Sequence, residues 1–515
     1  MTSRRLGVAT LLVCLVLLLP TLTFRMGVDQ GSFAYIGSEI LKGHWPYLDT
    51  WESDFPGMMF LHAGIMLVFG KSIAMFRVFD LVVQLLVVSL IYRITTRVST
   101  PVGGFLAGAL YCLIYQGWGP WNTAQREGFA VPLVLWGCWL FLTASRRTPE
   151  RTALGIGLGL GAAALFKPTL LALGAFYLPL LPNFRRNGGW RPLGLALVGV
   201  GLPAAVFVVL YALKGGLHEM IEATVSYQAI YTARLRGDGP VLAHWVGNTL
   251  RLGPQAMALA LGYLPFLFHP GERKPRVMLY LGYLGATLGV VVQGTFAGYH
   301  YLPGMAIGAI LVGSAFGQVS TWLQGRLWRF RLGRHDLVLA SLVLLVIMPA
   351  YLHGESLRDL ASLRFLEPPS PRSTPGTVFD FTESYALAQY FHQETDPSDR
   401  VQVWGYEPLV YFLANRTAAS RFAISHPLVI RVPGESLTPM QQDWRREFLR
   451  DIRDRAPRFV AVVRRDNWWW APEERTSEQL LDDFPEWKHM LQERYVPDRT
   501  IGRFQVFRLR AGEGT

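Results

Sequence analysis

Five acidic residues follow the first long apolar run of the chain, and their chemistry would suit a site outside a membrane. They are Asp29, Glu39, Asp49, Glu52 and Asp54. Carboxylate oxygens hold divalent metal ions, and a carboxylate can also take the proton of a hydroxyl group that attacks a substrate. Acids also collect in outer loops without any chemical role, because Asp and Glu hardly affect membrane orientation. The residues alone leave both interpretations open.

Other chemically capable residues stand at the ends of apolar segments. Arg126 and Glu127, in "NTAQREGFA", open one segment, where a charged pair is costly and indicates a function; an ion pair that fixes the helix end is the alternative. Lys167, in "LFKPTLL", lies between two short apolar runs and can grip a phosphate as a point charge. His300 and Tyr299, in "GYHYLPG", follow another run, where an aromatic belt would also explain the tyrosine.

The elements that must position these residues are membrane-spanning helices. Of the 515 residues 51% are hydrophobic and 17% charged, and the mean hydropathy is +0.25, which is typical of a membrane protein. A shorter apolar stretch at 58–70 predicts a half-span that dips into the membrane. Eleven apolar stretches predict crossings, and they lie at 6–24, 72–92, 101–116, 128–144, 153–166, 169–182, 193–213, 252–268, 277–296, 302–322 and 335–353.

Basic residues between these stretches predict the orientation. With the N-terminus in the cytoplasm, the short inner loops carry Arg4, Arg5, Arg93, Arg97, Arg146, Arg147, Arg151, Arg185, Arg186, Arg191, Arg273, Lys274, Arg276, Arg326, Arg329, Arg331 and Arg334. The positive-inside rule then places the C-terminus outside. No cleavage site of small residues follows the first run, so we expect it to be retained as a span. The net charge of +12 lies on arginines scattered between apolar runs, so no nucleic-acid partner is expected.

The chain divides into three parts by composition. Residues 1–353 are expected to form the transmembrane domain, with a long outer loop at 25–57. The proline-rich stretch 354–375 is the expected linker. Residues 376–515 predict a small outer-side α/β domain. Helical patterns at 383–395, 440–456 and 476–484 alternate there with the strand-like stretches "RVQVWG", "RFVAVV" and "GRFQVFRL".

The candidate residues all fall on the outer side under this topology. Basic groups that can bind a phosphate are combined there with acids that can bind a metal or take a proton from a hydroxyl. This combination favours a lipid-phosphate substrate that lies in the outer leaflet of the membrane.

A resemblance to a known family rests mainly on the first outer loop. "DQGSFAYIGSEILKGHWPYLDTWESDFPGMMFLHAG" resembles the corresponding loop of bacterial membrane glycosyltransferases with the GT-C fold, the glycosyltransferase family 39-like relatives of the protein O-mannosyltransferases and of the aminoarabinose transferase that acts on lipid A. The shared turn, G-x-x-P-Y-x-D, is Gly43, Pro46, Tyr47 and Asp49 here. "QREGF", "LFKPTLL", "HYLPG" and "VWGYEPLVYFLANRTAASRF" are further matches.

The resemblance implies a polytopic α-helical membrane protein, a GT-C-like bundle that transfers a glycosyl residue from a polyprenyl-phosphate-linked donor. The acceptor would be a glycolipid, a polysaccharide or a protein on the outer side of the bacterial cytoplasmic membrane, and the transfer would invert the anomeric carbon. Membrane lipids would surround the protein.

Carried over residue by residue, the resemblance makes Asp29 the catalytic residue, acting as general base, and Asp54 part of a site for a divalent metal of unknown identity. Arg126, Lys167 and His300 would contact the donor phosphate, with Glu127 and Tyr299 in the same substrate-binding group. The chain departs from several relatives at one point, where Phe55 stands in place of a lysine next to the acid.

Two functions of other classes compete with the transferase. A transporter or flippase of lipid-linked sugars would show paired inverted repeats and polar groups near the membrane midplane, whereas this chain concentrates its polar residues on the outer side. A non-catalytic assembly scaffold is the third interpretation, and the presence of Asp29 argues against it.

Overall fold

The computed structural model describes residues 3–180, 189–236, 243, 245–247, 273–294, 296–327, 382–432, 434–466 and 475–512. By their internal contacts the residues form two compact units. Unit 1 comprises Met1–Phe24, Ala74–Val208 and Gly239–Pro368, and unit 2 comprises Arg25–Ile73, Val209–Asp238 and Pro369–Thr515.

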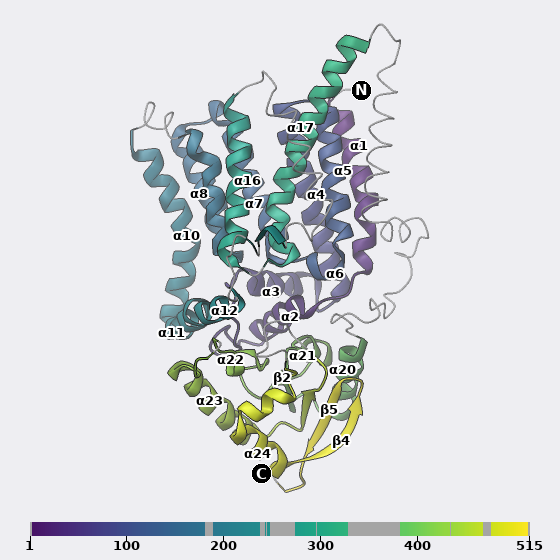
Figure 1. Cartoon of the computed structure of the whole chain (residues 1–515), viewed down its shortest axis with the longest axis vertical. Helices are drawn as coiled ribbons and strands as arrows, with labels where there is room; N and C mark the ends of the chain where they lie inside the picture. The colour runs from purple at the N-terminus through teal and green to yellow at the C-terminus, as the bar shows by residue number, and fades with distance from the viewer. Residues whose placement is uncertain are drawn as a thin grey trace. The chain divides into compact units, whose positions relative to one another are not determined.

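Unit 1 is a bundle of apolar helices (Figure 1). Its described helices are α1 (Ser3–Leu18), α4 (Ile73–Val98), α5 (Pro101–Gly117), α7 (Arg126–Leu142), α8 (Pro149–Phe166), the 3₁₀ segment η3 (Pro168–Leu180), most of α10 (Arg191–Lys214), α16 (Arg273–Gln293) and α17 (Leu302–Leu327). Helix α5 packs on α17, α7 on α8, and α16 on η3. The buried core between them consists mainly of Leu, Ile, Val, Ala and Tyr side chains.

Local sequence signals explain where these helices begin. Helix α5 is preceded by Thr100, whose side chain accepts a hydrogen bond from the backbone of Gly103, and it starts with a proline. The threonine–proline pair Thr148 and Pro149 starts α8 in the same way. These caps satisfy backbone N–H groups that have no partner within the helix.

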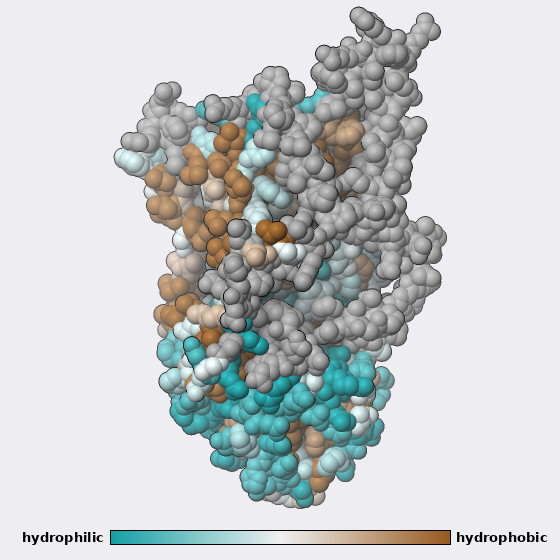
Figure 2. All heavy atoms as spheres, in the orientation of Figure 1, coloured by the Kyte–Doolittle hydropathy of each residue, from teal (hydrophilic) through white to brown (hydrophobic). Residues whose placement is uncertain are grey.

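Within the described residues, five helices are long and apolar enough to cross a membrane, and they lie at Ser3–Thr23, Ile73–Val98, Arg191–Lys214, Lys274–Gln293 and Gly298–Gln318. Helix α10 leaves most of its apolar side chains exposed, as expected of a helix that faces lipid, and Figure 2 shows an apolar surface over α8 and α10. The protein is therefore a multi-pass membrane protein. The expected crossings 252–268 and 335–353 and the linker 354–375 lie outside the described residues, so the count of eleven stays a prediction.

Unit 2 combines Arg25–Ile73, which includes the expected outer loop 25–57, with Val209–Asp238 and the C-terminal residues. It contains α2 (Val28–Leu41), α3 (Gly57–Phe69), α11 (Leu217–Ile221) and α12 (Tyr227–Arg236), and the C-terminal helices α20 (Thr382–Glu394), α21 (Leu409–Ala414), α22 (His426–Val429), α23 (Pro439–Arg455) and α24 (Pro485–Arg494). The apolar stretch 58–70 forms the helix α3, and its entry into the membrane as a half-span stays a prediction.

A five-stranded sheet organises the C-terminal part, and its order is β2-β1-β3-β5-β4. The strands are β1 (Arg400–Trp404), β2 (Thr417–Ala418), β3 (Phe459–Val463), β4 (Tyr495–Ile501) and β5 (Phe504–Leu509). Strand β1 runs parallel to β2 and β3, whereas β5 runs antiparallel to β3 and β4. The central strand β3 is buried along its whole length, as its continuous apolar sequence requires.

The expected strands "RVQVWG", "RFVAVV" and "GRFQVFRL" are β1, β3 and β5, and the expected helices at 383–395 and 440–456 are α20 and α23. The stretch 476–484 forms only a short 3₁₀ turn, at Gln479–Asp483. Figure 2 shows a mostly hydrophilic surface over this C-terminal part, in contrast to α8 and α10.

Candidate functional site

Unit 1 brings a buried carboxylate and two basic side chains together. The Lys167 ammonium lies 3.3 Å from Oε1 of Glu127, and Nε2 of His300 lies 3.8 Å from the same oxygen. Lys167 Nζ and His300 Nε2 are 3.1 Å apart. The side chains of Glu127 and His300 are 1% and 3% exposed, so water screens the ion pair between Glu127 and Lys167 only weakly. Residues from three separate segments therefore form one buried cluster.

Arg126 and Tyr299 extend this cluster. The Arg126 guanidinium donates a hydrogen bond of 3.2 Å to the Tyr299 hydroxyl and lies 5.6 Å from the centre of the tyrosine ring. The ring of Tyr299 meets His300 edge to face at 4.6 Å, and its backbone N–H donates to the side chain of Asn122. We call Arg126, Glu127, Lys167, Tyr299 and His300 the basic cluster.

Each member of the basic cluster sits where the sequence interrupts a helix. Lys167 ends α8 in an extended conformation, because Pro168 disfavours a helical residue before it. Glu127 occupies the first turn of α7, where the helix dipole favours an acid. His300 lies in the 3₁₀ turn Gly298–Tyr301 that leads into α17. Helix ends expose side chains and backbone groups that a continuous helix would hide.

A buried hydrogen-bond network holds the loop before α7. Tyr115 donates to Asp80 at 2.7 Å, and its hydroxyl accepts the backbone N–H of Ala124 at 2.8 Å. Gln84 donates to the same Asp80 oxygen at 3.0 Å. Arg77 donates to the hydroxyl of Thr123. These contacts fix the position at which α7 starts and thus the place of Arg126 and Glu127.

The basic cluster can hold an anion. The cluster contains one carboxylate and the cations of Arg126 and Lys167, so it carries excess positive charge whenever both cations are protonated. Within the described residues, neither side-chain oxygen of Glu127 has a hydrogen-bond partner, although Oε1 lies in the ion pair with Lys167. The tyrosine hydroxyl and the guanidinium add hydrogen-bonding groups of the kind that recognise phosphate.

Asp29 lies in unit 2, in the first turn of α2, and it is half-buried. The hydroxyl of Tyr406 donates a 3.0 Å hydrogen bond to its Oδ1. The ring of Tyr406 stacks on His426, with 5.6 Å between ring centres and an angle of 21°. His426 in turn shares a 2.7 Å hydrogen bond with the Tyr227 hydroxyl. Burial lowers the pKa of His426 to about 3, so this imidazole is neutral at physiological pH.

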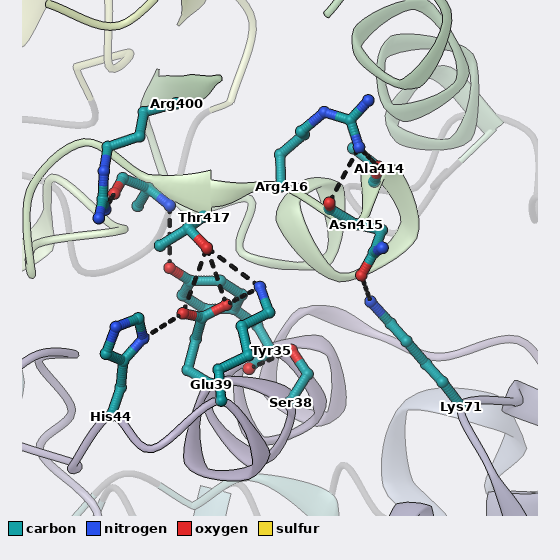
Figure 3. A network of polar contacts seen from close by, with 12 residues as sticks. Tyr35, Ser38, Glu39, His44, Lys71, Arg400, Ala414, Asn415, Arg416 and Thr417 are labelled. Atoms are coloured by element: carbon teal, nitrogen blue, oxygen red, sulfur yellow. Dashed lines mark hydrogen bonds and ion pairs between the residues drawn. The ribbon is translucent and has the colours of Figure 1, made fainter. Parts of the chain in front are cut away.

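Three of the other acids in the first loop are held by local partners. Glu39 contacts Lys42 at 2.7 Å. It also contacts His44 at 2.7 Å, as Figure 3 shows. Glu52 accepts hydrogen bonds from the Ser32 hydroxyl and the Ser53 backbone. Asp49 accepts the backbone N–H of Trp45 at 2.7 Å and so closes the G-x-x-P-Y-x-D turn. For these acids the interpretation as structural residues fits the contacts best.

Asp54 is half-buried, and its backbone carbonyl accepts a hydrogen bond from Tyr47. Among the residues that the structure describes, no three or more His, Cys, Asp or Glu side chains are grouped so that they could hold a metal ion. The metal expected at Asp54 therefore stays a prediction, and we derive no step through a metal.

The sequence analysis missed Tyr406, His426 and Tyr227. Tyr406 lies two residues after the end of β1 in "VWGYEP", a stretch that the sequence analysis used for the family resemblance without assigning a role to any residue in it. A polar residue just beyond a strand end is a common place for function, and that signal was available.

The comparisons with known proteins agree with this fold. The family model for dolichyl-phosphate-mannose-protein mannosyltransferase matches residues 53–211. A search of curated proteins finds no match.

Two solved structures from different organisms are similar over most of the chain. ArnT from Cupriavidus metallidurans bound to undecaprenyl phosphate has a TM-score of 0.61 at 15% identity and covers 99% of this chain and 98% of that one. The archaeal oligosaccharyltransferase AglB from Archaeoglobus fulgidus, in complex with an inhibitory peptide and a dolichol-phosphate, has a TM-score of 0.51 at 12% identity and covers 89% and 69%. The chain thus has a helical, ArnT-like GT-C fold, and its resemblance to the GT-C membrane glycosyltransferases that use polyprenyl-phosphate donors is confirmed.

Proposed function

We propose that the protein transfers a glycosyl residue from a polyprenyl-phosphate-linked donor to an acceptor hydroxyl on the outer side of the bacterial cytoplasmic membrane. The observation that carries the proposal is the basic cluster, in which Lys167 and His300 lie beside Glu127 and Arg126 donates a hydrogen bond to Tyr299, within a GT-C fold. The transferred sugar is a hexose or a pentose. The acceptor is a glycolipid, a polysaccharide or a protein.

In this proposal the basic cluster binds the donor phosphate. Lys167 and Arg126 supply fixed positive charge, and Tyr299 adds a hydroxyl group. Glu127 keeps the ammonium of Lys167 in place between turnovers. As the glycosidic C–O bond breaks, negative charge grows on the departing phosphate, and preformed positive groups in a poorly hydrated site stabilise that charge strongly.

Asp29 acts as the general base. Its carboxylate takes the proton from the acceptor hydroxyl as the acceptor oxygen attacks the anomeric carbon, and the phosphate leaves from the opposite face, which inverts the configuration. Asp54 is a further acid in the same loop, and a divalent metal there remains part of the proposal without any step assigned to it.

The proposed orientation follows from the distribution of basic residues. The N-terminus faces the cytoplasm, and the C-terminal α/β part lies outside, where lipid-linked donors are used. Under this orientation both the basic cluster and Asp29 belong to the outer side.

The test is the release of polyprenyl phosphate from a panel of lipid-linked sugars by the full-length protein in detergent. Asp29→Asn is compared with the native chain at matched thermal stability. Asp482→Asn serves as the control, because Asp482 forms an exposed ion pair with Lys488 on the surface of unit 2 and such pairs contribute little.

We expect Asp29→Asn to abolish release and Asp482→Asn to leave it unchanged. Full activity of Asp29→Asn would refute the role of the base. If the native protein consumes no donor but moves lipid-linked sugar across vesicle membranes, the transporter interpretation replaces the transferase.

A further inference from the structure

Helix α2 and the segment 406–418 of the C-terminal part lie against each other in a regular series of contacts. Asp29 meets Tyr406, and further along the helix Tyr35 accepts the backbone N–H of Ala418 at 3.0 Å. One turn later Glu39 accepts a hydrogen bond from Thr417, as Figure 3 shows. The loop that carries the proposed base is thus joined along its length to residues more than 370 positions away.

The two segments meet at the level of the backbone. A Cβ atom at Gly31 would lie only 2.6 Å from Cβ of Leu409 and 2.9 Å from its Cα, so the close approach of α2 and α21 requires a glycine there. Gly31 follows Asp29 by two residues, and Leu409 follows Tyr406 by three. The close packing therefore fixes the distance between the carboxylate and the phenol.

Tyr406 is also held from its other side. His426 stacks on its ring, and the hydrogen bond between His426 and Tyr227 limits rotation of the imidazole. Tyr227 and His426 are both buried, and Tyr227 packs edge to face on Trp51 at 4.9 Å. The orientation of the phenol is therefore set by residues from the first outer loop, from α12 and from the C-terminal part.

We infer that the C-terminal α/β part completes the catalytic centre, with Tyr406 as a positioning residue that orients the carboxylate of Asp29 toward the acceptor hydroxyl. This inference rests on the proposed function. The carboxylate of an aspartate rotates easily about the χ1 and χ2 bonds of the side chain. A hydrogen bond from a phenol held in place selects one of these orientations. Catalysis depends steeply on such placement, since a displacement of about 1 Å can reduce the rate about 100-fold.

The step is a proton transfer coupled to displacement. The acceptor O–H proton moves to the carboxylate of Asp29 while the acceptor oxygen forms a bond to the anomeric carbon. The bond from that carbon to the phosphate oxygen breaks, and the phosphate leaves with the electron pair. Tyr406 keeps its proton throughout and donates it as a hydrogen bond to Oδ1.

Tyr406→Phe tests the inference, because it removes only the hydroxyl and keeps the ring that stacks on His426. We expect kcat to fall about tenfold or more, in line with the value of a hydrogen bond to a charged group, while the KM for the donor stays within about twofold. Tyr390→Phe is the matched control, since it removes a tyrosine–aspartate hydrogen bond to Asp498 elsewhere in unit 2. Rates are normalised to the fraction of folded protein.

A double-mutant cycle separates positioning from a structural effect. If Tyr406 acts through Asp29, then Tyr406→Phe lowers the residual rate of Asp29→Glu by much less than it lowers the native rate. The inference would be overturned if Tyr406→Phe lowered the transfer rate equally in the native and the Asp29→Glu backgrounds, or if Tyr406→Phe kept the native kcat. In either case, a loss of activity in Asp29→Asn would still support the transferase. No turnover by the native protein would overturn both.

Discussion

A carboxylate as deeply buried as Glu127 needs positive charge beside it, and Lys167 provides it. Removing one partner of a buried ion pair is strongly destabilising because the other charge is left without compensation. The basic cluster therefore has two separable roles, one in the stability of the helix ends and one in the binding of phosphate.

Lys167→Met is expected to lower kcat/KM for the lipid-linked donor about 10- to 150-fold, which corresponds to the loss of one charged hydrogen bond to phosphate. It should also lower the thermal midpoint, since Glu127 loses its ion pair. Kinetics of polyprenyl phosphate release and thermal unfolding in detergent measure the two effects.

The double variant Lys167→Met with Glu127→Gln removes both charges together. Stability should recover toward the native value, whereas donor use should remain impaired. Recovery of activity along with stability would mean that the pair serves only to hold the helix ends.

Asp466 predicts a pH dependence of stability in the C-terminal part. Burial raises its pKa to about 7, against the opposing effect of the hydrogen bonds that the backbone and hydroxyl of Ser477 donate to it. Between about pH 4 and 7 the folded state keeps this proton and the unfolded state loses it, so stability falls as the pH rises. The slope from this group is about 1.4 kcal/mol per pH unit in that window.

Asp466→Asn should flatten this slope. Tryptophan fluorescence reports the transition, because the indole N–H of Trp404 donates to the carbonyl of Ser477, next to the aspartate. From pH 4.5 to pH 8 the thermal midpoint of the native chain should fall relative to that of the variant, because only the native chain has an acid to deprotonate at this position. Parallel curves would contradict the assignment. These pH values span the window set by the two pKa values.

At the scale of elements, the packing of α2 against α21 depends on one missing side chain. Gly31→Ala would place a methyl group 2.6 Å from Leu409, and overpacking of this kind costs about 1–3 kcal/mol. The substitution should also lower transfer activity, because it pushes Asp29 away from Tyr406. Chemical denaturation and the transfer assay measure both losses.

Gly64→Ala is the matched control in α3. A Cβ at Gly64 has no atom within 4 Å, and the residue is exposed. Alanine is the better helix former by about 1 kcal/mol, so this variant should be as stable as the native chain or more so. A loss similar to that of Gly31→Ala would show that the close contact is not the cause.

The sequence identified the members of the basic cluster as candidates because they have unusual residue types at recognisable helix ends. Lys167 precedes a proline, and Arg126 with Glu127 opens an apolar segment. That these ends meet in space follows from helix packing, which hydrophobic patterns do not specify. The contact of Asp29 with Tyr406 could not be predicted from the sequence for the same reason, because hydrophobic periodicity indicates local structure and not contacts between residues hundreds of positions apart.

At the scale of the whole molecule, the proposed orientation can be tested with cysteines. The three native cysteines, Cys14, Cys112 and Cys138, are buried, so they are poor targets for a membrane-impermeant maleimide. Ser145→Cys lies in an expected inner loop and Glu435→Cys in the C-terminal part, and both positions are exposed. In intact cells the maleimide should label Glu435→Cys and not Ser145→Cys, while both should react after lysis.

Labelling of Ser145→Cys in intact cells would reverse the orientation and place the C-terminal part in the cytoplasm. A chain without transfer activity but with the expected labelling would leave the orientation intact. The two proposals thus have independent tests.

Unit 2 is built from segments far apart in the sequence, and this has a consequence for biosynthesis. Its proposed base is made early, and the tyrosine that contacts the base is made 377 residues later. A ribosome that adds about 5–20 residues per second needs roughly 20–75 s to cover that distance. During this interval α2 has been made, but α21, on which it packs in the finished protein, has not. The nascent chain therefore contains Asp29 without the tyrosine that orients its carboxylate. A chain that ends before Tyr406 would keep Asp29 and the bundle helices, but it would not transfer the sugar from its donor.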